Sequence, residues 1–180
     1  MAQVSISRRY ARALLEVGIE SGQADAILGE LEQLVDEIHA SKALVALIES
    51  PVFARSERRR VIDALAERMK LSKTTHDFLK LLVDRERTPL LPEMVRIYRD
   101  LADEAANRVR ATVTTPMPLT DAEATGLEKA LESATGKTVT LGRAEDPTLL
   151  GGLVATVGDK TFDASLKTQL ALLKQAALER

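Results

Sequence analysis

The hydrophobic period of this chain changes once, near Asn107, and that change divides the sequence into two parts. Upstream, apolar residues recur every three or four positions, as they do on one face of a helix. Downstream, Val109, Ala111 and Val113 alternate with polar residues, which is the period of a half-buried strand. We therefore expect a helical domain over residues 1–106 and a small mixed α/β domain over 107–180. The predicted fold class is mainly α, and α+β overall.

Six helices are expected in the first domain, packed as a six-helix bundle. The second is the clearest, because its apolar residues from Ala24 to Ile38 fall at helical spacing. The third stops before Pro51, since the residue before a proline disfavours helix. The expected helices are 5–21, one spanning 24–38, 42–49, a fourth capped by Ser56, a fifth capped by Thr75 or Ser72, and a sixth with Pro92 in its first turn.

In the second domain, Thr120 and Glu123 have the spacing of a capping box, and Gly136 is placed to end the helix that follows. Short strands are expected around 139–141, 153–157 and 161–162, with a final helix from Ser165.

Composition excludes several classes of function. The net charge of −2 and an aromatic content of 3% give no basis for nucleic acid as the main partner. Cysteine is absent, and the only histidines, His39 and His76, lie far apart, so neither a thiolate site nor a zinc site is expected. No apolar run approaches the ~18 residues of a membrane span. We expect no cofactor, no metal and no catalytic activity.

One segment, Gly158-Asp159-Lys160-Thr161, resembles the end of a phosphate-binding loop. Asp159 separates glycine from lysine and places a negative charge where phosphate would bind, and the following residues alternate like a strand. The segment is therefore interpreted as a hairpin turn.

Two helices have apolar faces wider than one core contact requires. At ~100° per residue, the apolar residues of the first helix, from Tyr10 to Ile19, spread over roughly 240°, and those of the fifth over roughly 200°. Such helices are either central in the bundle or left with one side for a partner, and the wheel alone does not decide between these. Ala11, Ala13 and Gly18 are small enough to let another helix approach closely.

A basic cluster provides an alternative function. Arg55, Arg58, Arg59 and Arg60 begin the fourth helix, and such a cluster can contact RNA phosphates. Glu57 and Asp63 flank these arginines, and a solvated helix start is the favoured interpretation. RNA binding remains the alternative hypothesis.

The two ends of the chain together resemble one family, the delta subunit of bacterial F-type ATP synthase, the counterpart of the mitochondrial oligomycin-sensitivity-conferring protein. The resemblance covers the whole chain. At the start it depends on Arg9-Tyr10-Ala11-x-Ala13-Leu14. The motif near the end consists of Asp146, Leu149, Gly151, Gly152, Leu153, Gly158, Asp159, Asp163 and Ser165.

The resemblance implies a stator subunit with no active site, present in one copy per complex. The bundle would bind the N-terminal helix of an alpha subunit, and the second domain would hold the b-subunit peripheral stalk. By resemblance, the alpha-facing groove would be formed by Tyr10, Ala13, Val17, Phe78 and Leu81. The family also implies a peripheral position on the cytoplasmic face of the bacterial plasma membrane, without direct membrane insertion, and no homo-oligomer.

Overall fold

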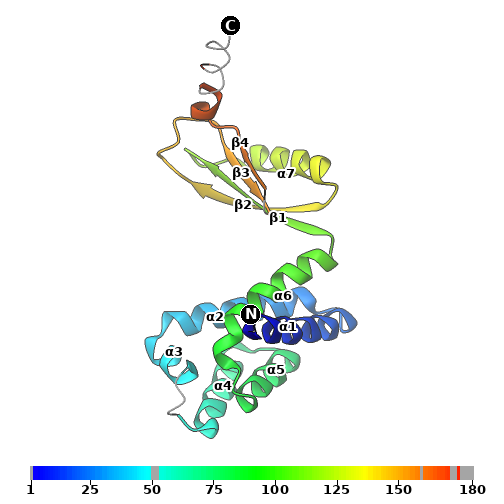
Figure 1. Cartoon of the computed structure of the whole chain (residues 1–180), viewed down its shortest axis with the longest axis vertical. Helices are drawn as coiled ribbons and strands as arrows, with labels where there is room; N and C mark the ends of the chain where they lie inside the picture. The colour runs from blue at the N-terminus through cyan, green and yellow to red at the C-terminus, as the bar shows by residue number, and fades with distance from the viewer. Residues whose placement is uncertain (1, 50–52, 159, 171–173, 175–180) are drawn as a thin grey trace. The chain divides into compact units, whose positions relative to one another are not determined.

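The chain is mainly helical, with a small mixed sheet of four strands (Figure 1). The computed structural model describes residues 2–49, 53–158, 160–170 and 174. The chain divides into two compact units, Met1–Ala102 and Asp103–Arg180. This division falls slightly before the boundary expected at 106, because Asp103 accepts a hydrogen bond from Nε of Arg110 at 2.6 Å and so belongs with the sheet.

Six α-helices and one short 3₁₀ helix precede the first strand in the described part of the chain. They are α1 (Ala2–Glu20), α2 (Ala24–Ala40), α3 (Lys42–Glu49), α4 (Arg55–Met69), α5 (Lys73–Asp84), η1 (Thr88–Leu90) and α6 (Leu91–Ala105). Their apolar faces share one core, whose largest fully buried side chains include Tyr98, Leu31 and Leu79. The Ser50-Pro51 stop that we expected after α3 lies outside the described residues.

Two of the expected helix starts can be compared with the structure. Ser72 is the N-cap of α5, and its hydroxyl accepts a hydrogen bond from the backbone N–H of Thr75 at 3.3 Å. The prediction that Ser56 caps α4 is wrong, because the helix begins at Arg55 and its N-cap is Ala54, two residues before Ser56. There the Glu57 carboxylate accepts a hydrogen bond from the backbone N–H of Ala54 at 3.0 Å. An acidic side chain from the first turn of the helix thus provides the hydrogen-bond acceptor at its N-terminus.

The second unit contains β1 (Arg108–Thr115), α7 (Asp121–Thr135), β2 (Thr138–Glu145), β3 (Val154–Val157) and β4 (Lys160–Asp163). The strand order is β2-β1-β3-β4, with β1 and β2 parallel and the other neighbours antiparallel. Thus α7 is the crossover between parallel strands, and it lies along the sheet in Figure 1. The predicted Thr120–Glu123 capping box and the Gly136 cap of α7 are confirmed.

The core of the second unit is small. Ala111, Val139 and Val157 are buried, and Leu131 of α7 packs against them. After β4 a further helix covers residues 166–170, as expected from Ser165. With so few buried side chains, this unit depends on its turns and close backbone contacts as well as on apolar burial.

Candidate functional site

A groove between α1 and α5 brings together all five residues that the sequence assigned to a partner-binding surface. Its volume is about 390 Å³, and it is lined by Tyr10, Ala13, Leu14, Val17, Thr74, Asp77, Phe78 and Leu81. The α1 residues follow the spacing i, i+3, i+4 and i+7, so they form one stripe of the helix. A groove flanked by two helices and lined mostly by apolar side chains is suited to a third, amphipathic helix.

The wide apolar faces of both helices are used partly for the core and partly for this groove. Phe78 is only 8% exposed and belongs to the core, so it forms the floor. Val17 and Leu81 are 47% and 42% exposed, so they form the rims. Central packing and an exposed apolar strip, which the helical wheel could not separate, therefore coexist on the same helices.

Only one of the three small residues of α1 is free for a partner. Ala13 is exposed and lines the groove, whereas Ala11 is completely buried. A Cβ on Gly18 would lie 2.8 Å from the hydroxyl of Tyr98, whose side chain belongs to α6. Helices do approach closely at these small residues, as predicted: Gly18 lies against α6 and α2 of the same unit, and Ala11 is buried in its core. Only Ala13 faces the groove.

A carboxylate from α2 fixes the beginning of α5. Glu30 accepts hydrogen bonds from the backbone N–H of Ser72 at 3.0 Å and from its hydroxyl at 2.8 Å. The hydroxyl of Thr75, which is completely buried, also donates to this carboxylate. Negative charge at a helix N-terminus is favourable, and three donors converge on it here. No sequence pattern pointed to Glu30, because its partners are more than forty positions away along the chain.

On the rim of the groove, Asp77 pairs with Lys73 at 3.1 Å within α5. The hydrogen bond from Lys73 lowers the pKa of the Asp77 carboxyl below its ordinary value. On the other side of α5, His76 Nε2 lies 2.6 Å from Oδ1 of Asp63 in α4, and that contact likewise lowers the pKa of Asp63. Both acids are therefore ionised at neutral pH, and on this rim of the groove the charge of Asp77 is balanced by the ammonium group of Lys73.

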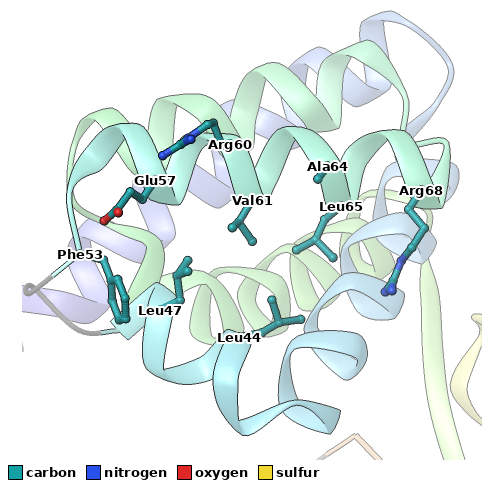
Figure 2. A pocket seen from close by; sticks show the side chains of 9 residues that line it. All are labelled: Leu44, Leu47, Phe53, Glu57, Arg60, Val61, Ala64, Leu65 and Arg68. Carbon is teal, nitrogen blue, oxygen red and sulfur yellow. The ribbon is translucent and has the colours of Figure 1, made fainter.

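A second groove lies between α3 and α4 (Figure 2). Val61 and Leu65 of α4 point toward Leu44 and Leu47 of α3, and Phe53 lies at one end. Residues 50–52, which precede Phe53, are outside the described ranges. The sequence reasoning missed this groove, because the apolar residues of α3 and α4 are those of an ordinary amphipathic helix.

The basic cluster at the start of α4 is largely occupied by internal contacts. Arg55 donates to Glu86 at 2.9 Å, and Arg59 lies 3.6 Å from Asp84. Arg58 is buried and donates to the backbone oxygen of Phe53 at 3.2 Å. These arginines tie α4 to the end of α5 and to the preceding turn, so no specific observation favours RNA binding over a structural role.

The glycine pair of the C-terminal motif builds a close backbone crossing. A Cβ on Gly152 would lie 2.3 Å from the backbone oxygen of Ala164. The φ angle of Gly152 is +80°, which disfavours any residue other than glycine. A Cβ on Gly151 would lie 2.6 Å from the side chain of Leu166, whose N–H donates to the Gly151 oxygen at 2.9 Å. The pair therefore joins the segment before β3 to the start of the last helix.

The polar residues of the motif make turns around this crossing. Asp146 accepts a hydrogen bond from the N–H of Thr148 at 2.9 Å, and the N–H of Leu149 donates to the Asp146 backbone oxygen at 3.1 Å. Asp163 accepts from the N–H of Ser165 at 2.9 Å, and Ser165 accepts from the N–H of Thr168 at 3.3 Å.

Gly158 ends β3, while Asp159, the residue that argued against a phosphate loop, lies outside the described residues. The remaining motif residues thus have local structural roles, and no ligand site is needed to account for them. In the described ranges, no three His, Cys, Asp or Glu side chains group as a metal site. No helix there is long and apolar enough to cross a membrane.

Comparison with known proteins places this architecture in one family. The family model described as ATP synthase delta (OSCP) subunit matches residues 6–177. The chain belongs to the ATP synthase delta (OSCP) subunit family. Members of this family are structural, non-catalytic subunits of ATP synthase. This chain is therefore a subunit of the complex that carries out ATP synthesis, and it belongs to the peripheral stalk of that complex.

Bacterial relatives of the family match nearly the whole chain. ATP synthase subunit delta of Anaeromyxobacter dehalogenans (strain 2CP-C) is 40% identical over 175 residues, which are 97% of this chain and 98% of that protein. The subunit of Myxococcus xanthus (strain DK1622) is 37% identical over 182 residues and covers 100% of both chains. The subunit of Geotalea uraniireducens (strain Rf4) is 36% identical over 174 residues, 97% of each.

A solved structure supports the fold. One chain of the mitochondrial ATP synthase hexamer of Toxoplasma gondii matches with a TM-score of 0.68, covering 96% of this chain and 97% of that one. Its sequence identity is 22%, so this match concerns the fold alone. The family model and the bacterial relatives together confirm the resemblance inferred from the motifs at the level of the family.

Proposed function

We propose that this chain is the clamp that links the catalytic head of ATP synthase to its peripheral stalk. Its six N-terminal helices act as one six-helix bundle on the head, and the second unit holds the b subunits of the stalk. Rotation of the central shaft exerts torque on the head, and synthesis requires the head to be held against it. Such a part needs affinity and stiffness rather than chemistry, so proton-driven rotation is coupled to synthesis without an active site here.

The observation that carries the proposal is the α1/α5 groove. It is lined mostly by apolar side chains, and its floor is fixed by the core through Phe78 and Leu14. A floor that is already packed loses little conformational freedom on binding, which favours affinity. We propose that the N-terminal helix of an alpha subunit lies in this groove, contacting Tyr10, Ala13, Val17 and Leu81 with Phe78 beneath.

The groove is tested by calorimetric titration of the full chain with a synthetic peptide of the alpha-subunit N-terminus. Replacing Tyr10 or Ala13 by Asp places a charge in the apolar groove and is expected to abolish measurable binding. Ala43→Asp, at an exposed position of α3, is the matched control and is expected to bind normally. Unchanged affinity in both Asp variants would contradict the groove assignment.

We propose that the stalk binds near the beginning of the last helix. Leu150, Leu166 and Leu170 are 78%, 45% and 60% exposed, and Leu166 packs on the Gly151 turn. Leu166 and Leu170 lie four positions apart on the last helix and so share one face, and exposed leucines on one helix face are the surface expected for a helical partner.

Co-purification with the b subunits tests this surface. Leu170→Asp should remove the b subunits, whereas the control Met117→Asp, at another exposed apolar position, should not. Equal recovery of the b subunits with both variants would contradict the stalk assignment.

As part of this assembly, we propose that the chain lies peripherally on the cytoplasmic face of the plasma membrane.

A further inference from the structure

Both walls of the α1/α5 groove are attached to a third helix, α2, which contributes no residue to the lining of the groove. The α5 wall is attached where the Glu30 carboxylate accepts two hydrogen bonds from Ser72. The α1 wall is attached at the first residue of α2, Ala24, as described next. The two walls therefore take their positions from one helix that lies outside the groove.

Gly18 is the residue of α1 that lies against the start of α2. It is buried, and its backbone oxygen accepts a hydrogen bond from the N–H of Gln23 at 2.8 Å in the turn between the two helices. A Cβ on Gly18 would lie 3.1 Å from Cα of Ala24 and 3.4 Å from Cδ1 of Ile27. The absence of a side chain here thus determines how closely α1 approaches α2.

The hydroxyl of Tyr98, from α6, fills the space beside Gly18. A Cβ on Gly18 would lie only 2.8 Å from this hydroxyl oxygen. The oxygen is held in place because it donates a hydrogen bond to the backbone oxygen of Ala24 at 3.0 Å, and the Tyr98 side chain is completely buried. A phenol packed and hydrogen-bonded in this way has no free space to move into. A side chain at position 18 would therefore displace α1.

A displacement of α1 at Gly18 would reach the groove directly. Val17, the preceding residue, forms a rim of the groove, and Leu14, one turn earlier, forms part of its floor. To reach ordinary van der Waals contact, a Cβ at position 18 must move away from the Tyr98 oxygen by roughly 0.5–1 Å. Because a helix moves as a unit, the whole α1 wall near Val17 would shift with it.

We propose that α2 sets the spacing of the groove, and that Gly18 and Tyr98 are positioning residues for its α1 wall. Gly18 leaves room for the Tyr98 hydroxyl, and that hydroxyl binds α6 to the start of α2. Glu30 positions the α5 wall in the same way. The spacing is a property of the chain alone, whereas its effect on affinity rests on the proposed function, which supplies a helix to bind in the groove.

The spacing can be measured by double electron–electron resonance between nitroxide labels on Val17→Cys and Leu81→Cys, which mark the two rims in a chain without other cysteines. Gly18→Ala should shift the mean distance between the labels by about 1 Å. Adding Tyr98→Phe to Gly18→Ala should return the distance toward its native value, because the oxygen that the new Cβ meets is gone. An unchanged distance in Gly18→Ala, or a shift that survives Tyr98→Phe, would overturn the inference.

Two controls on α2 separate spacing from stability. Gly29→Ala is the same substitution at a position where no atom lies within 4 Å of the new Cβ, and it should leave the distance unchanged. Ile38→Val, at the other end of α2, removes a buried methylene and should lower the free energy of unfolding without changing the distance. Glu30→Ala should shift the distance from the α5 side. This variant decides the question if Gly18→Ala does not fold, and an unchanged distance would then refute the inference.

Calorimetric titration of the unlabelled variants with the alpha N-terminal peptide measures the effect on binding. Gly18→Ala should weaken the peptide about tenfold, because the displaced wall no longer fits its partner closely. Tyr98→Phe alone should weaken it about twofold, and the double variant should bind more tightly than Gly18→Ala. Equal losses of affinity in Ile38→Val and Gly18→Ala would assign the effect to stability and refute the positioning role.

The failure of this inference can be told apart from the failure of the clamp. Native affinity in Gly18→Ala, together with binding that is abolished by Ala13→Asp, would leave the groove in place and refute only the positioning role. Absence of binding to the native chain would refute the clamp, and the distances between the labels would still decide whether α2 sets the spacing. Circular dichroism at 222 nm checks that each variant keeps its helices.

Discussion

The carboxylate of Glu30 accepts two hydrogen bonds from Ser72, one from its backbone N–H at 3.0 Å and one from its hydroxyl at 2.8 Å. Through these bonds α2 holds the first turn of α5, the helix that forms one wall of the groove. Thr75, which is fully buried, donates to the same carboxylate. The position of the wall therefore depends on a residue that does not line the groove.

Replacing Glu30 by Ala should destabilise the helical unit by about 1–3 kcal/mol, because the buried hydroxyl of Thr75 and the donors of Ser72 at the start of α5 lose their acceptor. Urea unfolding measures the change. Glu32→Ala is the matched control. Glu32 is also on α2 and pairs with Arg99 at 2.7 Å, but that pair is partly exposed and should contribute less than about 1 kcal/mol. Equal losses in the two variants would contradict a special role for Glu30.

Replacing Gly152 by Ala should destabilise the second unit by more than about 2 kcal/mol, since the new Cβ meets the Ala164 backbone and the residue must keep a positive φ. Amide hydrogen exchange in β3 and β4 reports this locally. Gly126 lies inside α7 with no atom near its missing side chain. Gly126→Ala should therefore stabilise α7 by about 0.5–1 kcal/mol. Protection of β3 and β4 that survives Gly152→Ala would refute the close crossing.

Stability should fall at high pH because of one buried phenol. Burial raises the pKa of Tyr98 from 10.0 to about 12, and its hydroxyl donates to the oxygen of Ala24 at 3.0 Å. The folded chain thus holds this proton more tightly than the unfolded chain does. The resulting stabilisation is complete below pH 10 and is lost as the pH rises from 10 to about 12.

Tyr98→Phe tests this pH dependence. The variant should lose about 0.5–1.5 kcal/mol at neutral pH with the hydrogen bond. The free energy of unfolding of the variant should also fall much less between pH 10 and 12 than that of the native chain. Urea unfolding across that range measures both effects, and an unchanged slope in the variant would assign the decline to other groups.

The last helix should fray in acid. Hydrogen bonds from Ser165, and then from Thr168, lower the pKa of Asp163 below its usual 3.8. The carboxylate therefore stabilises the helix start above pH 3.8, and this contribution is lost as the pH falls through the lowered value. Asp163→Asn should remove the pH dependence, as followed by the chemical shift of the Ser165 amide. A Ser165 shift that titrates equally in the variant would refute this cap.

The sequence was most informative where one residue type has one physical consequence. The change of period at Asn107, the Thr120–Glu123 box and the αL glycine at 136 each determine a local conformation, and all three are present in the structure. The groove residues Tyr10 and Leu81 were named from a resemblance, and the structure brings them together.

What the sequence could not provide depends on contacts between distant helices. Whether Ala11 faces a partner or the core of its own unit depends on how α1 packs. The role of Glu30 depends on its contact with Ser72, which only the fold brings close. Ser56 has the residue type of a cap, but Glu57 performs that function from inside the helix. Exposure, which separates Val17 from Leu14 on the same apolar stripe, likewise comes from the fold.

Cross-linking in the assembled ATP synthase tests the central claim most directly. The chain contains no cysteine, so Val17→Cys introduces a single thiol on the rim of the groove. A photoactivatable maleimide at this position is predicted to attach the chain to the N-terminal segment of an alpha subunit, as identified by mass spectrometry of the adduct. The same probe on Met117→Cys should give no such adduct. Attachment of the Val17 probe only to other subunits, in a complex that retains this chain, would contradict the account.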